Sequence, residues 1–170
     1  ISDIRGICDG SNSSFAFSNK SMKIEAESYS SCTYGQQYVN SIWQQKEAFG
    51  NYSGQSYMAA LPDSKSNIGD SLDGPELIYN ITNLNPGRYH LWIRMAAPDG
   101  GGDSIHVGLD GTPITYGGVG LSTHSNGEWN WEYISITVPT NDYTELSIWM
   151  REDGIKIDSL VVTTDPDLVP

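Results

Sequence analysis

The sequence predicts an all-β protein, folded as one antiparallel β-sandwich. Three observations support this prediction. The 170-residue chain contains 18 Gly, 10 Tyr and 5 Trp, a composition that favours short strands joined by tight turns. Apolar and polar residues alternate in several short segments, and turn signals with Gly or Pro separate these segments. A chain of this length is also long enough to bury roughly 70% of the surface that its unfolded form exposes.

Each alternating segment predicts a strand with one buried face. In chain order the apolar sets are Met22/Ile24/Ala26, Leu77/Tyr79/Ile81, Tyr89/Leu91/Ile93/Met95, Ile105/Val107/Leu109, Ile134/Ile136/Val138 and Leu146/Ile148/Met150. Turns are expected at Asn85-Pro86-Gly87, Asp110-Gly111 and Asp153-Gly154. Strands at this spacing form antiparallel sandwiches. The segment SIWQQKEAF, residues 41–49, predicts about one turn of helix at most.

The two ends of the chain have the composition of connecting segments. Residues 1–20 are rich in serine and predict a linker or loosely attached arm. The compact domain is expected over residues 21–165, and residues 166–170 predict the start of a second linker because two prolines and two aspartates follow the last apolar strand. We therefore expect a monomeric module of a larger, multidomain protein.

Charge and cysteine content limit the partners and suggest the compartment. The net charge of −12 and the pI near 4.3 would repel nucleic acid and anionic membranes. The chain lacks an apolar run of transmembrane length and a signal-peptide pattern, so we expect a soluble fragment whose targeting signal is already absent. Cys8 and Cys32 suggest a disulfide in preference to two free thiols, which would suit a secreted protein.

Two glutamates separated by one alanine, Glu25 and Glu27, pose a chemical question. In an extended strand they would point to the same side, roughly 6.6 Å apart, where like charges repel. The pair is explained if both are solvated, if one keeps its proton for acid/base work as in inverting glycosidases, or if a cation lies between them. Asp158 stands among apolar residues near the C-terminus. If the first and last strands are adjacent, it joins the glutamates in an oxygen shell suited to Ca²⁺.

Four segments in order resemble a known family. They are "IEAE", "LNPGRYHLWIRMAAPDGGGDSIHVGLDG", "GEWNWEYISITV" and "LSIWMREDGIKIDSLVVTTD", and together they are similar to the family 6 and family 35 carbohydrate-binding modules. The resemblance implies a β-jelly-roll attached to a polysaccharide-degrading enzyme. It also implies a structural calcium ion held by Glu25, Glu27 and Asp158.

The aromatic residues suggest where a sugar would bind, because sugar rings stack on indole and phenol rings. The resemblance implies that Trp129, if it belongs to the loop before its strand, stacks on the ligand and that Trp131 is structural. It places a second aromatic wall in the loop after "IEAE", for which the candidates are Tyr34, Tyr38 and Trp43. Lys156 occupies the position of an asparagine that binds ligand in the family. Asp103, beside a glycine-rich loop, is a further candidate for sugar binding.

The sequence contains no convincing catalytic motif. Its three histidines are scattered, and no Ser or Cys lies in a nucleophile-elbow motif. We therefore predict non-catalytic binding of a polysaccharide or oligosaccharide, with galactan or xylan favoured. The alternatives are a sandwich-fold glycan lyase or hydrolase, which can work through carboxylates or a Tyr/Lys pair, and an adhesion module that contacts protein.

Overall fold

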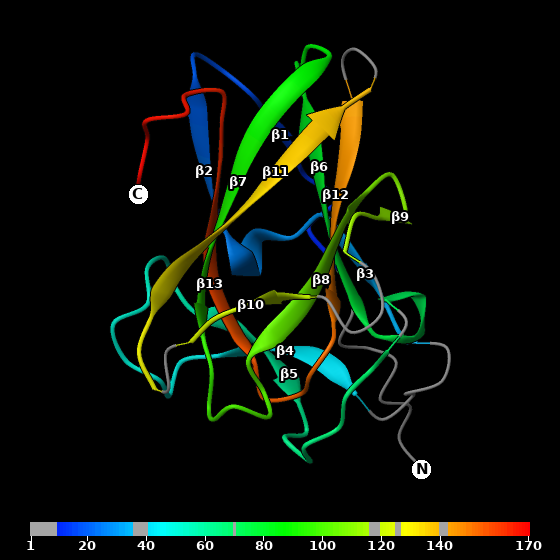
Figure 1. Ribbon diagram of the computed structural model, residues 1–170, viewed down its shortest axis with the longest axis vertical. Coiled ribbons are helices and arrows are strands. Elements are labelled where there is room, and N and C mark those ends of the chain that lie inside the picture. The colour runs from blue at the N-terminus through cyan, green and yellow to red at the C-terminus, as the bar shows by residue number, and fades with distance from the viewer. Residues whose placement is uncertain (1–9, 36–40, 70, 116–119, 125–126, 140–142) are drawn as a thin grey trace.

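The computed structural model describes residues 10–35, 41–69, 71–115, 120–124, 127–139 and 143–170. Within these ranges it is a sandwich of two β-sheets (Figure 1). Two short 3₁₀ turns, η2 (Ala26–Ser28) and η3 (Ser71–Asp73), are its helical elements there. No helix in these ranges has the length and apolar character that crossing a membrane requires. The all-β prediction is confirmed.

The first sheet has the strand order β1-β6-β12-β8-β10, with β3 paired to β6 and β9 to β8. Its members are β1 (Ser14–Ala16), β3 (Ser31–Thr33), β6 (Glu76–Thr82), β8 (Ser104–Leu109), β9 (Thr112–Pro113), β10 (Leu121–Ser122) and β12 (Tyr143–Met150). The second sheet has the order β11-β7-β13-β5-β4, with β2 paired to β13. Its members are β2 (Ser21–Glu25), β4 (Ile42–Lys46), β5 (Tyr57–Leu61), β7 (Gly87–Ala96), β11 (Asn130–Val138) and β13 (Lys156–Thr163).

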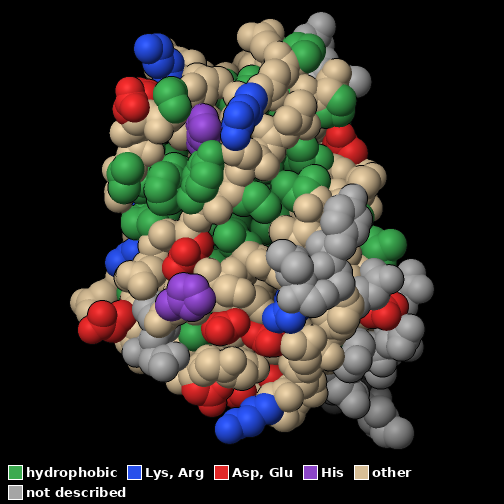
Figure 2. All heavy atoms as spheres, in the orientation of Figure 1, with side chains coloured by type: hydrophobic (Ala, Val, Ile, Leu, Met, Phe, Trp, Pro, Cys, Tyr) green, Lys and Arg blue, Asp and Glu red, His purple; other side chains and the backbone are tan. Residues whose placement is uncertain are grey.

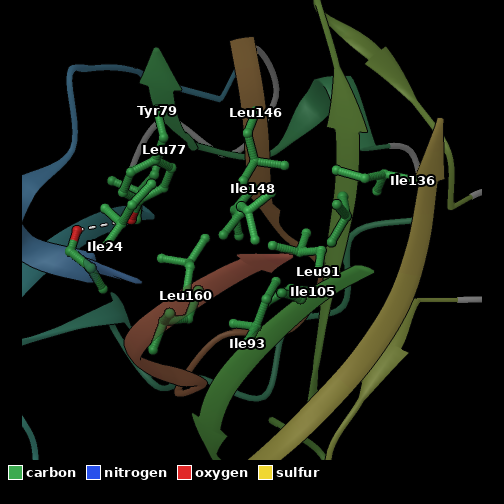
Figure 3. Packing of buried hydrophobic residues seen from close by; sticks show 14 of the residues in the cluster. Ile24, Leu77, Tyr79, Leu91, Ile93, Ile105, Ile136, Leu146, Ile148 and Leu160 are labelled. Atoms are coloured by element: carbon green, nitrogen blue, oxygen red, sulfur yellow. Dashed lines mark hydrogen bonds between the residues drawn. The ribbon is translucent and has the colours of Figure 1, made fainter. Parts of the chain in front are cut away.

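The alternating apolar residues form the core between the sheets. Leu77, Leu146 and Ile105 of the first sheet face Ile93 and Leu160 of the second (Figure 3). The strands predicted from two-residue periodicity are therefore confirmed, with their apolar faces directed inward. Tyr79 also lies in this core, and its hydroxyl donates a hydrogen bond to the Ala26 carbonyl at 2.8 Å, which satisfies an otherwise buried polar group.

Two segments differ from their predictions. Residues 42–46 form β4, which pairs with β5, instead of a helical turn. Residues 14–16 form β1, which pairs in parallel with β6, and the Phe17 side chain is buried in the core. Residues 14–17 of the serine-rich segment are thus part of the sandwich, which begins before the boundary expected at residue 21. Cys32 is disulfide-bonded, while Cys8, the only other cysteine of the sequence, lies outside the described residues.

The beginning and the end of the domain lie side by side, as the sequence suggested. β2 pairs with β13 in antiparallel register, and Glu25 lies opposite Ser159. On its other edge β13 pairs with β7, with a register shift between Ile157 and Ser159. Asp158 is the extra residue at this β-bulge. Because a bulge redirects a side chain, Asp158 leaves the inward alternation of its strand and turns toward the loop between β4 and β5.

Candidate functional site

The loop between β4 and β5, residues 47–56, organises the candidate site. Glycine and asparagine shape it: Asn51 has φ +63° and Gly54 has φ +67°, a left-handed conformation that these residues adopt readily. A side chain at Gly54 would place its Cβ 2.5 Å from Glu27 Oε1. The loop backbone therefore packs directly against the carboxylates.

Asp158 is fully buried and completely engaged by neighbouring donors. Its Oδ1 accepts the backbone N–H of Ser53 at 2.7 Å. Its Oδ2 accepts Nη1 of Arg94 at 2.6 Å and the hydroxyls of Ser53 and Ser159 at 3.2 and 3.3 Å. The Arg94 guanidinium supplies the positive charge that a buried carboxylate needs.

Glu25 and Glu27 reach the same loop from different local structures. Glu25 ends β2, whereas Glu27 lies in the 3₁₀ turn η2, so the expectation that they share one extended strand is corrected. Glu25 pairs with Lys23 at 2.9 Å and accepts the Ser53 hydroxyl at 2.6 Å. Glu27 Oε1 accepts the backbone N–H groups of Gln55 and Ser56 at 2.8 and 3.3 Å. Its Oε2 is buried without a hydrogen-bond partner.

These contacts test whether the three carboxylates suit calcium. Their oxygens and the Ser53 hydroxyl are the hard donors that Ca²⁺ takes, and the orphaned Oε2 of Glu27 is available to a cation. In the described part of the chain, however, no three His, Cys, Asp or Glu side chains already gather at one point. Arg94 and Lys23 instead pair with two of the carboxylates. The donor chemistry fits calcium, and an ion there would replace these two contacts.

The same loop borders an open groove of about 290 Å³. It is lined by Phe49, Gly50, Asn51, Arg94, Gly127, Glu128 and Trp129. Trp129 directly precedes β11, so it belongs to the loop. This was the condition under which the sequence resemblance implied stacking on a sugar. Its indole is partly exposed, and ligand pockets typically combine such an apolar surface with a few polar groups.

The Trp129 ring is held in place on several sides. Its Nε1 donates to the Gly50 carbonyl at 2.9 Å. Arg94 lies over the ring with its Cζ 5.5 Å from the centroid, a cation–π contact. Phe49 and Tyr57 contact it at centroid distances of 5.3 and 5.7 Å with interplanar angles of 70° and 69°. Both rings meet the indole in a T-shaped arrangement and do not stack parallel to it.

Lys156 joins this cluster through Phe49. Its Nζ lies 5.1 Å from the Phe49 ring centroid, and burial lowers the pKa of its ammonium group, partly opposed by the charge of Asp63. The structure thus brings Lys156 and Trp129, two residues predicted to bind sugar, to the same aromatic cluster. A half-buried ammonium beside a groove is suited to donating hydrogen bonds to ligand hydroxyls.

Three other predicted sugar ligands, Trp43, Tyr34 and Asp103, are absent from the groove lining. Trp43 is 6% exposed, packs in the core and donates its indole N–H to the Pro75 carbonyl, so the expectation that it stacks on sugar is corrected. Tyr34 lines a different, very small cavity together with Trp43. Tyr38 lies outside the described residues. Asp103 donates its backbone N–H to Glu152 at 3.1 Å, and burial together with Glu152 raises the pKa of its carboxyl group.

Several residues of the site were missed by the sequence reasoning. Arg94 and Ser53 link the carboxylates to the loop, and Phe49 and Tyr57 support Trp129. The signal that was present is the segment FGNYSGQSY, residues 49–57, which combines aromatic rings with glycines between two strands. Trp131, expected to be structural, is partly exposed and lies opposite Arg94 on β7.

Comparison with known protein families and curated proteins gives one clear relative. No family model matches the sequence. A protein of Formosa agariphila, described as "Uncharacterized protein P23", is 30% identical over 145 residues, covering 71% of this chain and 35% of that protein. The chain thus spans about a third of the length of this relative.

Solved structures with the same architecture include carbohydrate-binding modules. A family 35 module from Paenibacillus barcinonensis superposes with a TM-score of 0.60 and 17% identity, over 85% of this chain and 99% of that one. A family 6 module of lichenase 5A from Cellvibrio mixtus, in complex with cellotriose, superposes with a TM-score of 0.56 and 15% identity, over 85% of this chain and 97% of that one. The chain therefore has the jelly-roll sandwich fold of the family 6 and family 35 carbohydrate-binding modules, as the sequence resemblance predicted.

Proposed function

We propose that this protein is a non-catalytic polysaccharide-binding module whose ligand occupies the groove beside Trp129. The observation that carries the proposal is the indole itself, which is partly exposed yet fixed by the Gly50 carbonyl and Arg94. A rigid aromatic surface loses little conformational entropy when a sugar ring stacks on it. The fold shared with carbohydrate-binding modules supports the same conclusion.

The polar groups around the groove suit sugar hydroxyls. Arg94 and the Asn51 backbone line it, and Lys156 lies beyond Phe49. Such groups fix the orientation of a ring that stacking alone leaves free to rotate. We favour a galactan or xylan backbone as ligand, because the net charge of −12 disfavours a densely charged polyanion at long range.

We propose further that the module belongs to a larger secreted protein with an attached glycan-degrading enzyme. The matched segment is 35% of the Formosa agariphila relative, which supports a module within a longer chain. The proposed binding domain comprises residues 21–165 together with β1, because β1 forms an edge strand of the first sheet.

A structural calcium ion held by Glu25, Glu27 and Asp158 is part of the proposal. The convergence of all three on the β4–β5 loop and the unpartnered Oε2 of Glu27 support it. The ion would supply positive charge and fix the loop that also carries Phe49 and the Gly50 carbonyl. The predicted role is therefore structural, since none of these three carboxylates lines the groove.

Calorimetry and affinity electrophoresis against galactan, xylan and β-glucans test the groove. We expect Trp129→Ala to weaken binding at least tenfold, as loss of a stacking platform does, and to lower the melting temperature modestly, because the indole also contacts Phe49, Tyr57 and Arg94. Tyr143→Ala is the control, because this exposed aromatic residue lies on β12 of the other sheet and is absent from the groove lining. If Trp129→Ala binds the polymers as tightly as the unmodified protein does, the groove is not the ligand site. Release of reducing ends from any polymer would favour the enzyme alternative.

A further inference from the structure

The outer face of β7 and β11 carries a second group of side chains with recognition chemistry. Tyr89, Leu91 and Ile93 of β7 point into the core, so the intervening residues project outward. Strand register places Tyr133 opposite Trp92 and Ser135 opposite His90. We define the β7–β11 outer face as Arg88, His90, Trp92, Tyr133 and Ser135.

Tyr133 is the exposed aromatic centre of this face. Its side chain is 41% exposed, and its ring stacks on His90 with a centroid distance of 5.4 Å and an interplanar angle of 24°. Trp92 supports the same ring at 5.2 Å. Figure 2 shows hydrophobic side chains gathered in a band over this part of the surface, with a histidine and Lys or Arg side chains along one border. The result is a rigid, partly apolar platform.

Polar groups extend from the platform to an unpaired cation. Hydrogen bonds join His90 Nδ1 to Tyr133 Oη at 2.7 Å and Tyr133 Oη to Ser135 Oγ at 2.6 Å. Arg88 donates from Nη2 to Ser135 Oγ at 2.9 Å. Arg88 is exposed, and within the described residues it forms no ion pair. Most of its five guanidinium donors therefore remain available to a ligand.

The charge setting indicates which ligand this face would take. Four other basic residues of the described chain, Lys23, Lys65, Arg94 and Arg151, are paired with carboxylates. Among the described residues Arg88 is thus an exposed guanidinium without an ion pair, in a protein of net charge −12. A guanidinium binds planar or tetrahedral oxyanions through paired hydrogen bonds.

We propose that the β7–β11 outer face is a second glycan-binding surface, selective for a polysaccharide that carries sparse sulfate or carboxylate groups. A sugar ring lies on Tyr133, and the anionic substituent binds Arg88. The surface is distinct from the groove, because neither Tyr133 nor Arg88 lines it. Sparse substituents on a neutral backbone satisfy Arg88 without the long-range repulsion that a dense polyanion would meet.

Binding of four polymers to the whole protein tests this assignment: a sulfated galactan, a glucuronoxylan, and the two unsubstituted backbones. We expect Arg88→Ala to weaken binding of at least one anionic polymer about tenfold, which corresponds to the loss of a charged hydrogen-bonded pair. Binding of the neutral polymers should not change. Arg88→Lys keeps the positive charge but loses the forked set of guanidinium donors. Its affinity for the anionic polymer should therefore lie between those of the unmodified protein and Arg88→Ala. The two anionic polymers separate sulfate from carboxylate recognition.

Tyr133→Ala should weaken the same anionic binding, and Tyr143→Ala is the matched control because that tyrosine is 45% exposed on β12 of the other sheet. Circular dichroism melts verify that each variant folds. If binding of the anionic polymers persists in Trp129→Ala and decreases in Arg88→Ala, these polymers bind the β7–β11 outer face independently of the groove. The assignment is overturned if Arg88→Ala and Tyr133→Ala bind the anionic polymers as the unmodified protein does, or if anionic polymers bind no better than neutral ones.

Discussion

Arg94 Nη1 lies 2.6 Å from Asp158 Oδ2 and ties β7 to the bulge of β13. The same guanidinium donates to the Asn51 carbonyl at 3.0 Å and covers the Trp129 ring. One side chain therefore connects the buried carboxylates, the β4–β5 loop and the groove. Changes at the carboxylates are expected to reach the groove through this contact.

Arg94→Met should destabilise the protein because it leaves Asp158 buried without a compensating charge. Breaking a buried pair costs about 3–5 kcal/mol, and we expect about 2–3 kcal/mol because the Arg94 side chain is 24% exposed and partly screened. Urea denaturation measures the difference. Adding Asp158→Asn should restore part of the loss. Lys65→Ala is the control, since its partner Asp99 and Lys65 are both well exposed. An additive double mutant would contradict the coupling.

Calcium should raise the melting temperature of the protein. The three carboxylates carry −3 and the neighbouring Lys23 and Arg94 carry +2, leaving −1 near the loop. At 100 times the dissociation constant, mass action adds about 2.7 kcal/mol, or roughly 5–10 °C for a domain of this size. Differential scanning fluorimetry with calcium and with EDTA measures this shift.

Two variants locate the calcium effect. Glu27→Gln should reduce the shift because it removes the carboxylate with the unpartnered oxygen. Arg94→Met should enlarge it, since the competing cation is gone. The same melting temperature with calcium and with EDTA, in both the unmodified protein and Arg94→Met, would show that the basic side chains alone neutralise this cluster.

Gly54→Ala should destabilise the β4–β5 loop for two reasons. The residue has φ +67°, and an added Cβ would lie 2.5 Å from Glu27 Oε1. Strain of this kind costs on the order of 1–3 kcal/mol. Gly50→Ala is the control, because a Cβ there meets no atom within 4 Å. Thermal melts of the two variants should differ clearly, and similar melts would mean that the loop moves away from Glu27 without cost.

The core strands were predictable because burial on one face leaves a two-residue period in the sequence, as in Leu91 and Ile93 of β7. The sequences of β1 and β4 show no such two-residue period. The pairing of β1 with β6 joins Ser14 to Asn80, a contact across more than sixty residues that no local pattern encodes. β4 depends on its partner β5 in the same way, so its short apolar start at Ile42 resembled a helical turn.

The site was predictable where a residue was out of place in its segment. A carboxylate among apolar residues marked Asp158, and the resemblance to the carbohydrate-binding modules marked Trp129. Arg94 gave no such signal, because it occupies an ordinary outward position in an alternating strand. Its role arises from the bulge that turns Asp158 toward it. Trp43 follows the "IEAE" segment, where the resemblance places a sugar-binding aromatic residue. Pairing of its strand with β5 instead places its ring in the core.

Stability should decrease in acid partly through Glu152, which is 8% exposed. Burial raises its pKa, but hydrogen bonds from the Ser104 hydroxyl and the Asp103 backbone outweigh this and lower the pKa below its usual 4.5. A depressed carboxyl pKa contributes stability that is present above the unfolded value and is lost as pH falls through the folded value. The contribution of Glu152 should therefore be complete at pH 7 and decline below about pH 4.5.

Glu152→Gln isolates this contribution. At pH 7 we expect the variant to be about 1–2 kcal/mol less stable, because charged hydrogen bonds to Ser104, Asn67 and Arg151 are weakened. The gap from the unmodified protein should narrow in acid, where the unmodified Glu152 is itself protonated. Urea midpoints measured from neutral to acidic pH follow this gap, and the exposed Glu47→Gln controls for loss of one surface charge. A gap that stays constant with pH would mean that the Glu152 charge does not stabilise the fold, and that the amide simply fits the site poorly.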